Sequence, residues 1–352
     1  MNKFWSDNVG KLDPYVPGEQ PQDKQYLKLN TNESPYPPSP AVAAALATFD
    51  CENLRRYPDP ESSRLVSALA EYHGLSSQQV FVGNGSDEVL AHAFQALLQK
   101  PTAILFPDIS YSFYPVYCSL YRIEFKTVAL DPAFRIDIND YQAGNGGIVI
   151  PNPNAPTGIA LELNAIRQLL ENNSESVVII DEAYVDFGAE SALSLIADHH
   201  NLLVVQTFSK SRSLAGLRLG AAFGHPALIE ALQRVKNSFN SYPIDALTSA
   251  GAIASLADDA YFQRCRQQII ASRERLGVAL AQLGFEVFPS SSNFVFLCHV
   301  DHSAESLYLD LKQAGILVRY FNKPRIDNCL RITVGSDAEC DYLLSALEQI
   351  IV

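Results

Sequence analysis

Short apolar segments alternate with amphipathic helical segments from Val80 onward, and this alternation constrains the fold more than any other feature of the chain. Each apolar segment has three or four residues, rich in valine, isoleucine, leucine or phenylalanine; they occupy 80–82, 103–106, 148–150, 177–180 and 202–205. Runs this short and this apolar are typical of strands that are buried on both faces of a parallel sheet. The sequence therefore predicts an α/β fold with a mostly parallel central sheet covered by helices.

Polar residues follow several of these predicted strands, and a lysine is the most informative of them. Lys210 lies just past 202–205, in a segment that also carries three serines and two arginines, Ser209, Ser211, Ser213, Arg212 and Arg218. An isolated lysine is normally a solvated surface group. Neighbouring cations lower the pKa of an amine, and hydroxyls together with arginine suit a phosphate. The segment thus indicates a reactive amine beside an anion site, at the sheet edge where ligands bind.

Other strand ends carry residues that complete a candidate site. Ser86 and Asp87 begin a helix after a glycine turn, which presents backbone N–H groups to an anion, although Ser86 could be a simple helix cap. Asp181 ends the run 177–180 and could hold a ring nitrogen or cap a helix. Tyr111 and Tyr184 could contact a ring or pack in the core. An amine, a carboxylate, a phosphate site and aromatic rings together indicate a pyridoxal 5'-phosphate site.

The chain divides into three expected regions. A proline-rich arm occupies 1–38, a large cofactor-binding domain 39–245, and a smaller C-terminal α/β domain 246–352. A long helical stretch at 245–283 is expected to link the two domains. Arg319 and Arg331 lie in apolar strands of the small domain, where they either bind an anion or form structural ion pairs.

Composition excludes several classes of partner. The 352 residues include 26 Lys and Arg against 39 Asp and Glu, a formal net charge of -13, which argues against nucleic-acid and anionic-membrane partners. The start of the chain has no apolar signal region, so we expect a cytoplasmic protein. We expect no metal site, and we expect buried, reduced thiols at the six cysteines, which are Cys51, Cys118, Cys265, Cys298, Cys329 and Cys340.

The order and spacing of several motifs carry a resemblance that extends over essentially the whole chain. The chain resembles the fold-type I pyridoxal-phosphate aminotransferases, and among them the histidinol-phosphate aminotransferase family. Each motif is weak alone; the matching segments are Tyr15 in 13–18, 29–33, 56–59, 85–88, 156–158, 181–184, 209–210, 214–218 and 330–335.

The resemblance implies a role for each candidate residue at the cofactor. Lys210 would form the Schiff base, Asp181 would keep the pyridine nitrogen protonated, and Tyr184 would reach the phenolic oxygen of the ring. Tyr111 would stack on the ring. The cofactor phosphate would be held by Ser86, Asp87, Ser209 and Arg218, and by Tyr57 of a partner subunit, which implies a homodimer.

The resemblance also implies the substrates. Arg331 would bind the carboxylate of glutamate or 2-oxoglutarate, and with Arg319 the phosphate of the imidazole substrate. Tyr15 and Asn30 would complete this pocket, with Tyr15 closing over it. Lys210 would move the α-proton as base and then acid, and the kinetics would be ping-pong.

One position departs from the family pattern. The family has asparagine directly before Pro156, where this chain has Ala155 preceded by Asn154. Either Asn154 reaches the ring oxygen or Tyr184 holds that oxygen alone, and we favour Asn154.

Four other functions remain open at this point. A threonine-phosphate decarboxylase and an aromatic-amino-acid aminotransferase share the scaffold. A non-catalytic pyridoxal-phosphate-binding module lacks support from any DNA-binding appendage or basic arm. A hydrolase built on Ser209 and Lys210 would leave Asp181 and the phosphate loop unexplained.

Overall fold

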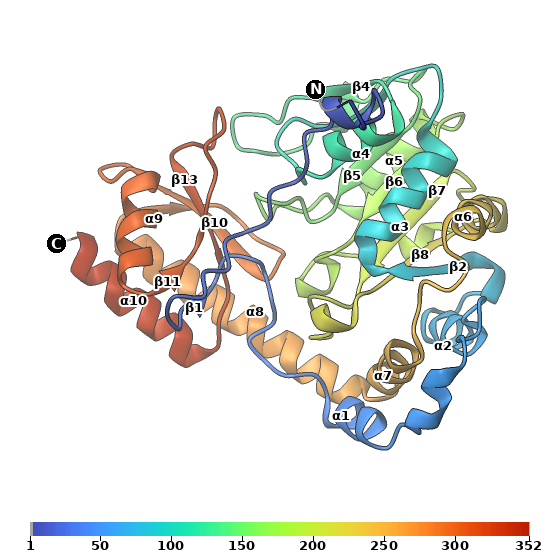
Figure 1. The fold of residues 1–352 in the computed structure, drawn as a ribbon. Helices are drawn as coiled ribbons and strands as arrows, with labels where there is room; N and C mark the ends of the chain where they lie inside the picture. Colours follow the sequence, from blue (N-terminus) through green and yellow to red (C-terminus); the bar gives the residue numbers. More distant parts are fainter. Residues whose placement is uncertain (1–2, 352) are drawn as a thin grey trace.

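The large sheet lies at the centre of the larger of the two parts of the computed structural model, which describes residues 3–351 (Figure 1). Its seven strands run in the order β2-β8-β7-β6-β5-β3-β4. The pairs from β7 to β4 are parallel, whereas β8 is antiparallel to both of its neighbours. The predicted mostly parallel sheet is therefore confirmed. The strands are β2 (Val80–Asn84), β3 (Ile104–Pro107), β4 (Phe125–Val128), β5 (Ile148–Pro151), β6 (Val178–Asp181), β7 (Leu202–Thr207) and β8 (Leu219–Gly224).

Helices cover both faces of this sheet because alternate residues of each buried strand point to opposite sides. In β6, Val178 and Ile180 join one core cluster and Ile179 joins the other. The first cluster contains residues of α2 (Ser63–His73), α5 (Leu163–Asn172) and α7 (Ala246–Ala257). The second contains residues of α3 (Gly85–Ala93), α4 (Tyr114–Tyr121) and α6 (Pro226–Phe239). The result is a three-layer α/β arrangement.

The C-terminal part of the chain forms a second, smaller unit (Figure 1). Its antiparallel sheet has the order β12-β13-β10-β9. Its strands are β9 (Phe285–Val287), β10 (Phe294–His299), β12 (Arg319–Tyr320) and β13 (Cys329–Thr333). Its apolar core is shared with α8 (Asp259–Gln282), α9 (Ala304–Gln313) and α10 (Asp337–Ile351).

The N-terminal segment runs as an arm from α4 to the small unit (Figure 1). Near its start, the Asn8 side chain donates to the Leu120 carbonyl of α4 over 3.5 Å. Farther along, β1 (Leu27–Lys28) pairs in parallel with β11 (Ile316–Leu317). The arm then leads to α1 (Pro40–Ala47), where the Ser39 hydroxyl accepts a hydrogen bond from Ala41 N and caps the helix.

The helical stretch predicted at 245–283 is two helices, α7 and α8, separated at Asp258. The Asp258 carboxylate caps α8 by accepting from Tyr261 N, and it accepts a second bond from the Ser39 hydroxyl over 2.7 Å. The prediction of a single long helix was therefore wrong, because this tertiary contact stabilises a break between two helices. Ala252 of α7 packs in the core of the large sheet. The predicted domain limits of 1–38, 39–245 and 246–352 stay predictions.

The cysteine prediction was wrong at three positions. Cys298 and Cys329 form a disulfide, because antiparallel pairing of β10 and β13 places them directly opposite each other. Cys51 is exposed, whereas the remaining three are free and buried as expected: Cys118, Cys265 and Cys340.

The remaining short elements are one-turn segments in the connections. They are the 3-10 helices Val9–Lys11, Cys51–Arg55, Ser77–Gln79, Ile138–Asp140, Val185–Phe187, Ala192–Leu195 and Ala215–Leu217, and the π-helix Phe94–Leu98. Within residues 3–351 no helix combines the length and apolarity needed to cross a membrane.

Candidate active site

A cavity of about 240 Å3 lies where the arm, the large sheet and the small unit meet. It is far larger than the roughly 15 Å3 that one water requires, so it can accept an organic ligand. The last residues of three neighbouring parallel strands line it, namely Pro151 of β5, Asp181 of β6 and Thr207 of β7. This is the sheet edge at which α/β proteins bind ligands. Every predicted site residue lines this cavity except Asn154 and Tyr57.

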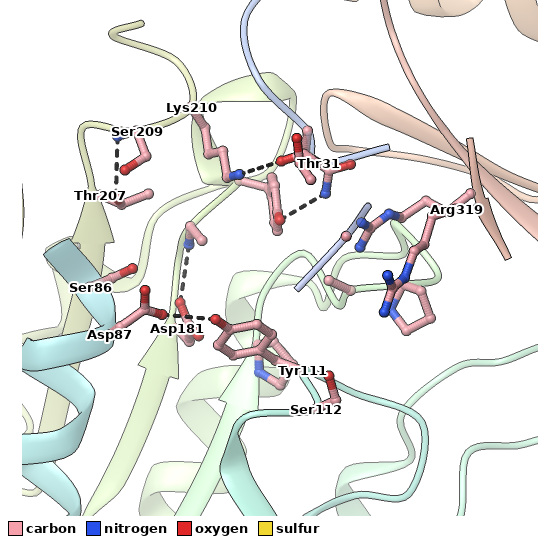
Figure 2. Close-up of a pocket in the computed structure, with 18 of the residues that line it drawn as sticks. Thr31, Ser86, Asp87, Tyr111, Ser112, Asp181, Thr207, Ser209, Lys210 and Arg319 are labelled. Atoms are coloured by element: carbon pink, nitrogen blue, oxygen red, sulfur yellow. Dashed lines mark hydrogen bonds between the residues drawn. The ribbon is translucent and has the colours of Figure 1, made fainter. Parts of the chain in front are cut away.

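Lys210 lies just after β7 and points across the cavity toward the arm (Figure 2). Its Nζ donates a hydrogen bond to the Thr31 carbonyl over 2.9 Å. Burial in the cavity wall, aided by the positive charge of Arg331, lowers the pKa of Lys210 to about 8. A useful fraction of this amine is therefore neutral near physiological pH, as a nucleophile or base requires.

Asp181 ends β6 in a buried environment. Its Oδ2 accepts a hydrogen bond from the Tyr114 hydroxyl over 2.8 Å, and its Oδ1 accepts one from Ala183 N. Burial raises the pKa of Asp181 to about 6, while these two hydrogen bonds oppose the rise. Tyr114, which is fully buried in α4, was missed by the sequence analysis. Its i+3 spacing from Tyr111 was the one available signal.

The start of α3 forms one corner of the cavity, which Ser86 and Asp87 line. The first N–H groups of a helix have no intrahelical partner and can donate to an anion. The helix passes very close to β8, since a Cβ added to Gly220 would lie 2.3 Å from Ser86 N. The structure places Asn84, not Ser86, at the cap position.

Two polar side chains bracket the Asp87 carboxylate in this corner. The Tyr111 hydroxyl donates to Asp87 Oδ1 over 2.8 Å (Figure 2), and Arg218 Nη2 lies 3.2 Å from Asp87 Oδ2. Arg218 has a left-handed φ of 53°. A Cβ added to Gly85 would lie 2.4 Å from Arg218 Nη2, so the glycine leaves room for the guanidinium. Asp87 thereby fixes a tyrosine and an arginine at the same corner.

Arg319 and Arg331 face each other across β12 and β13 on the opposite side of the cavity. Arg331 Nη2 donates to the Asn30 carbonyl over 3.2 Å, and its Nε is buried without a hydrogen-bond partner. No carboxylate within residues 3–351 lies at salt-bridge distance from either guanidinium. Two adjacent unpaired cations are costly without an anion, so of the two interpretations offered by the sequence the structure favours the anion site.

The arm supplies the remaining wall. The Tyr15 ring stacks on Phe113 with centroids 4.8 Å apart, and it lies 6.3 Å from the Tyr111 ring. The Asn30 amide donates to the Glu19 carbonyl over 2.9 Å, and its Oδ1 is buried without a partner. The arm is therefore an integral part of the cavity wall.

Tyr184 lines the cavity on the side of Lys210, whose Nζ lies 5.9 Å from the centre of the tyrosine ring. Burial raises the pKa of Tyr184, so its hydroxyl keeps its proton at neutral pH. The hydroxyl accepts a hydrogen bond from Asn32 Nδ2 over 2.9 Å. Asn32, another arm residue that lines the cavity, was not singled out by the sequence analysis.

Two predicted residues lie outside the cavity. Asn154 turns away from it and donates to the Ile109 carbonyl and to Thr157 Oγ1, both at 3.0 Å. Ala155 lines the cavity in its place. The amide nitrogen of Asn154 thus has other partners, while its Oδ1 is buried without one, and the role of Asn154 as a ring ligand stays a prediction. Tyr57 is 82% exposed and stacks on Tyr242 at 4.7 Å.

Comparison with known proteins identifies this class of site. The family model of aminotransferase class I and II matches residues 24–347, and the chain belongs to that family. It is 58% identical to histidinol-phosphate aminotransferase 1 of Bradyrhizobium diazoefficiens, covering 100% of both chains. It is 57% identical to histidinol-phosphate aminotransferase 1 of Hydrogenovibrio crunogenus, covering 100% of this chain and 99% of that protein. Within its class the chain is a member of the histidinol-phosphate aminotransferase family.

A solved structure supports the same assignment. Histidinol-phosphate aminotransferase from Sinorhizobium meliloti, determined in complex with pyridoxal-5'-phosphate, superposes with a TM-score of 0.88 at 25% identity. The alignment covers 100% of this chain and 98% of that one. The fold is therefore that of fold-type I aminotransferases.

The cavity fits pyridoxal 5'-phosphate, the cofactor of this family. Lys210 offers an amine whose pKa is lowered to about 8, and Asp181 a carboxylate fixed by two hydrogen bonds. The start of α3, with N–H groups that lack an intrahelical partner, and the guanidinium of Arg218 lie at one corner of the cavity. These groups match the aldehyde, the ring nitrogen and the phosphate of the cofactor.

Proposed function

We propose that this aminotransferase moves an amino group between histidinol phosphate and 2-oxoglutarate, giving imidazole-acetol phosphate and glutamate, as a step of histidine biosynthesis. The observation that carries the proposal is the pair of unpaired arginines, Arg319 and Arg331, across the cavity from Lys210. Guanidinium groups bind carboxylates and phosphates through paired charge-assisted hydrogen bonds. One pocket can therefore serve the two anionic substrates in turn.

Lys210 performs the covalent and proton-transfer work in this proposal. The bound cofactor supplies an electron-accepting ring that stabilises the negative charge left when an α-proton is removed. Lys210 Nζ would hold the cofactor between turnovers and, once a substrate amine has taken its place, would accept the α-proton of the substrate and donate it to a carbon of the cofactor. Its pKa of about 8 suits both directions of transfer near neutral pH.

Other residues hold the cofactor in place. Asp181, ionised, holds a proton on the ring nitrogen, and Tyr184 donates to the phenolic oxygen. Tyr111 packs against the ring. Backbone N–H groups of Ser86 and Asp87 bind the phosphate, joined by the Ser209 hydroxyl and by Arg218.

Substrate anions bind on the arginine side. Arg331 binds the carboxylate of glutamate or 2-oxoglutarate, and with Arg319 it binds the phosphate of the imidazole substrate. Tyr15 and Asn30 of the arm cover the bound substrate and exclude water. Because both substrates use one pocket successively, the kinetics are ping-pong.

We further propose a homodimer in which Tyr57 reaches the cofactor phosphate of the partner subunit. Tyr57 is exposed and stacks on Tyr242, which is also exposed, and Leu54, three residues earlier in the chain, is exposed as well. Exposed apolar residues that cluster in this way are typical of an interaction surface. The enzyme would work in the cytoplasm, since its phosphorylated substrates are charged metabolites that do not cross membranes unaided.

The competing functions make different products from different substrates. The test compares kcat/KM for amino transfer from histidinol phosphate, histidinol and aromatic amino acids, alongside CO2 release from threonine phosphate. The proposal predicts the highest kcat/KM for histidinol phosphate and a marked loss for histidinol, which lacks the phosphate. Preference for an aromatic amino acid, or CO2 release from threonine phosphate without amino transfer, would overturn it.

A further inference from the structure

Asn32 links the arm to β13 of the small sheet and to Tyr184, which follows β6 of the large sheet, at the edge of the cavity. The residue is 1% exposed and has a left-handed φ of 56°, a conformation that asparagine tolerates better than most residues. Its backbone carbonyl accepts a hydrogen bond from Asn293 Nδ2 over 3.0 Å, and its amide Nδ2 donates to the Tyr184 hydroxyl. A buried residue held in this way cannot easily change its orientation.

Hydrogen bonds to Thr333 determine which end of the Asn32 amide faces Tyr184. The Thr333 hydroxyl accepts from Asn32 N over 3.0 Å and donates to Asn32 Oδ1 over 3.2 Å. The amide oxygen is thereby occupied, so the Nδ2 group is the end that points to Tyr184. The Tyr184 hydroxyl acts as an acceptor toward Asn32 and keeps its own proton for another partner.

That proton has no acceptor among the protein groups of residues 3–351. Tyr184 lines the cavity, and so does Ala155, whose side chain has no polar group. The neighbours of Asn32 contact the other reactive groups: the Thr31 carbonyl accepts from Lys210, and the Asn30 carbonyl from Arg331. Three consecutive arm residues therefore orient three site residues.

We propose that Asn32 is a positioning residue for the transamination, which fixes the Tyr184 hydroxyl so that its proton is donated to the phenolic oxygen of the cofactor ring. This inference rests on the proposed function. A donor at that oxygen stabilises its negative charge and so reduces the proton affinity of the Lys210 nitrogen attached nearby. Asn32 would thus help to set the pH at which the lysine-bound cofactor loses its proton.

The test follows the absorption of the bound cofactor in the resting holoenzyme as a function of pH. The quantity compared between variants is the pH at the midpoint of the absorption change. Asn32→Gly keeps the left-handed backbone accessible and removes the amide. We expect the midpoint to rise by about half a unit to one unit, the equivalent of one ordinary hydrogen bond. In a Tyr184→Phe background the same substitution should produce no further rise. The charged groups facing Lys210 are unchanged in every variant; they are Arg331, Glu33, Asp87 and Arg218.

A matched control separates this role from simple stabilisation. Asn173 is also buried, and its amide donates to the Tyr141 and Leu169 carbonyls, away from the cavity. Asn173→Ala should lower the melting temperature without moving the midpoint. An unchanged midpoint in folded, cofactor-loaded Asn32→Gly, or an equal rise with and without the Tyr184 hydroxyl, would overturn the inference. Neither result would affect the proposed function, which is tested separately by the substrate preference of the unaltered enzyme.

Discussion

The Tyr114 hydroxyl donates a hydrogen bond to Asp181 Oδ2 over 2.8 Å, although the two residues are 67 positions apart in the sequence. Tyr114 is fully buried, so no water competes for this bond. The bond favours the ionised carboxylate and opposes the effect of burial, which raises the pKa of Asp181. Tyr114 therefore helps to keep Asp181 charged at neutral pH.

Replacing Tyr114 by phenylalanine should raise the pKa of Asp181 further, by about one unit. Because Asp181 must be ionised to hold the ring proton, the rising limb of kcat/KM against pH should move to higher pH. Tyr141→Phe is the control, since this buried hydroxyl has no partner. Coincident pH profiles for Tyr114→Phe and the unaltered enzyme would contradict the role given to Tyr114.

The two cavity arginines should differ in their effects on the two substrates. Arg331→Gln should lower kcat/KM for both glutamate and histidinol phosphate, roughly tenfold to a hundredfold, as expected for a lost charge-assisted hydrogen bond. Arg319→Gln should affect mainly histidinol phosphate. Arg234→Gln, which removes an exposed partner of Glu230, should change neither value. An equal loss of kcat/KM for glutamate and histidinol phosphate in Arg319→Gln would contradict this difference between the two arginines.

The free energy of unfolding of the apoenzyme should depend on pH through the amine of Lys210. Since its folded pKa of about 8 lies below the ordinary lysine value of 10.5, the unfolded state binds more protons between those pH values. The free energy of unfolding should therefore rise with pH across this window, and Lys210→Ala should lack that contribution. Denaturant titrations of both apoproteins from pH 7.5 to roughly 10.5 would measure the difference. A difference that is constant over that range would show that the pKa of Lys210 is not lowered.

A shared site across the dimer can be tested by mixing two variants. Lys210→Ala subunits lack the amine but retain Tyr57, whereas Tyr57→Phe subunits retain the amine. Hybrid dimers should contain one site with both groups and so recover the cofactor affinity that Tyr57→Phe dimers lose. No recovery after verified subunit exchange would place Tyr57 outside the partner's site.

The sequence predicted the parallel strands β3, β5, β6 and β7 and the residues at their ends, because buried strands are visible as short apolar runs. It did not reveal the parallel edge strand β4, most of whose residues are exposed. It did not reveal β8, whose glycine and alanine residues allow close approach to α3 but give no strong strand signal. At Gly220, for example, the close approach of Ser86 N requires a residue without a side chain, and glycine does not signal a strand.

Side-chain partners that are distant in sequence were not predictable. Asn32 and Tyr184 are 152 positions apart, and the Cys298–Cys329 disulfide depends on the register of β10 and β13. Arg212, which had no role in the sequence analysis, packs its guanidinium against the rings of Phe262 and Tyr72. Each contact arises from tertiary packing that no local pattern encodes.

Borohydride reduction of the cofactor-loaded enzyme, followed by peptide mass mapping, tests the central claim most directly. The claim is that Lys210 is the amine that carries the cofactor. The account predicts one reduced adduct whose mass is that of the cofactor less one water and plus two hydrogens, located on Lys210 and absent from Lys210→Ala. A cofactor adduct on a different lysine, or none on a fully loaded enzyme, would contradict it.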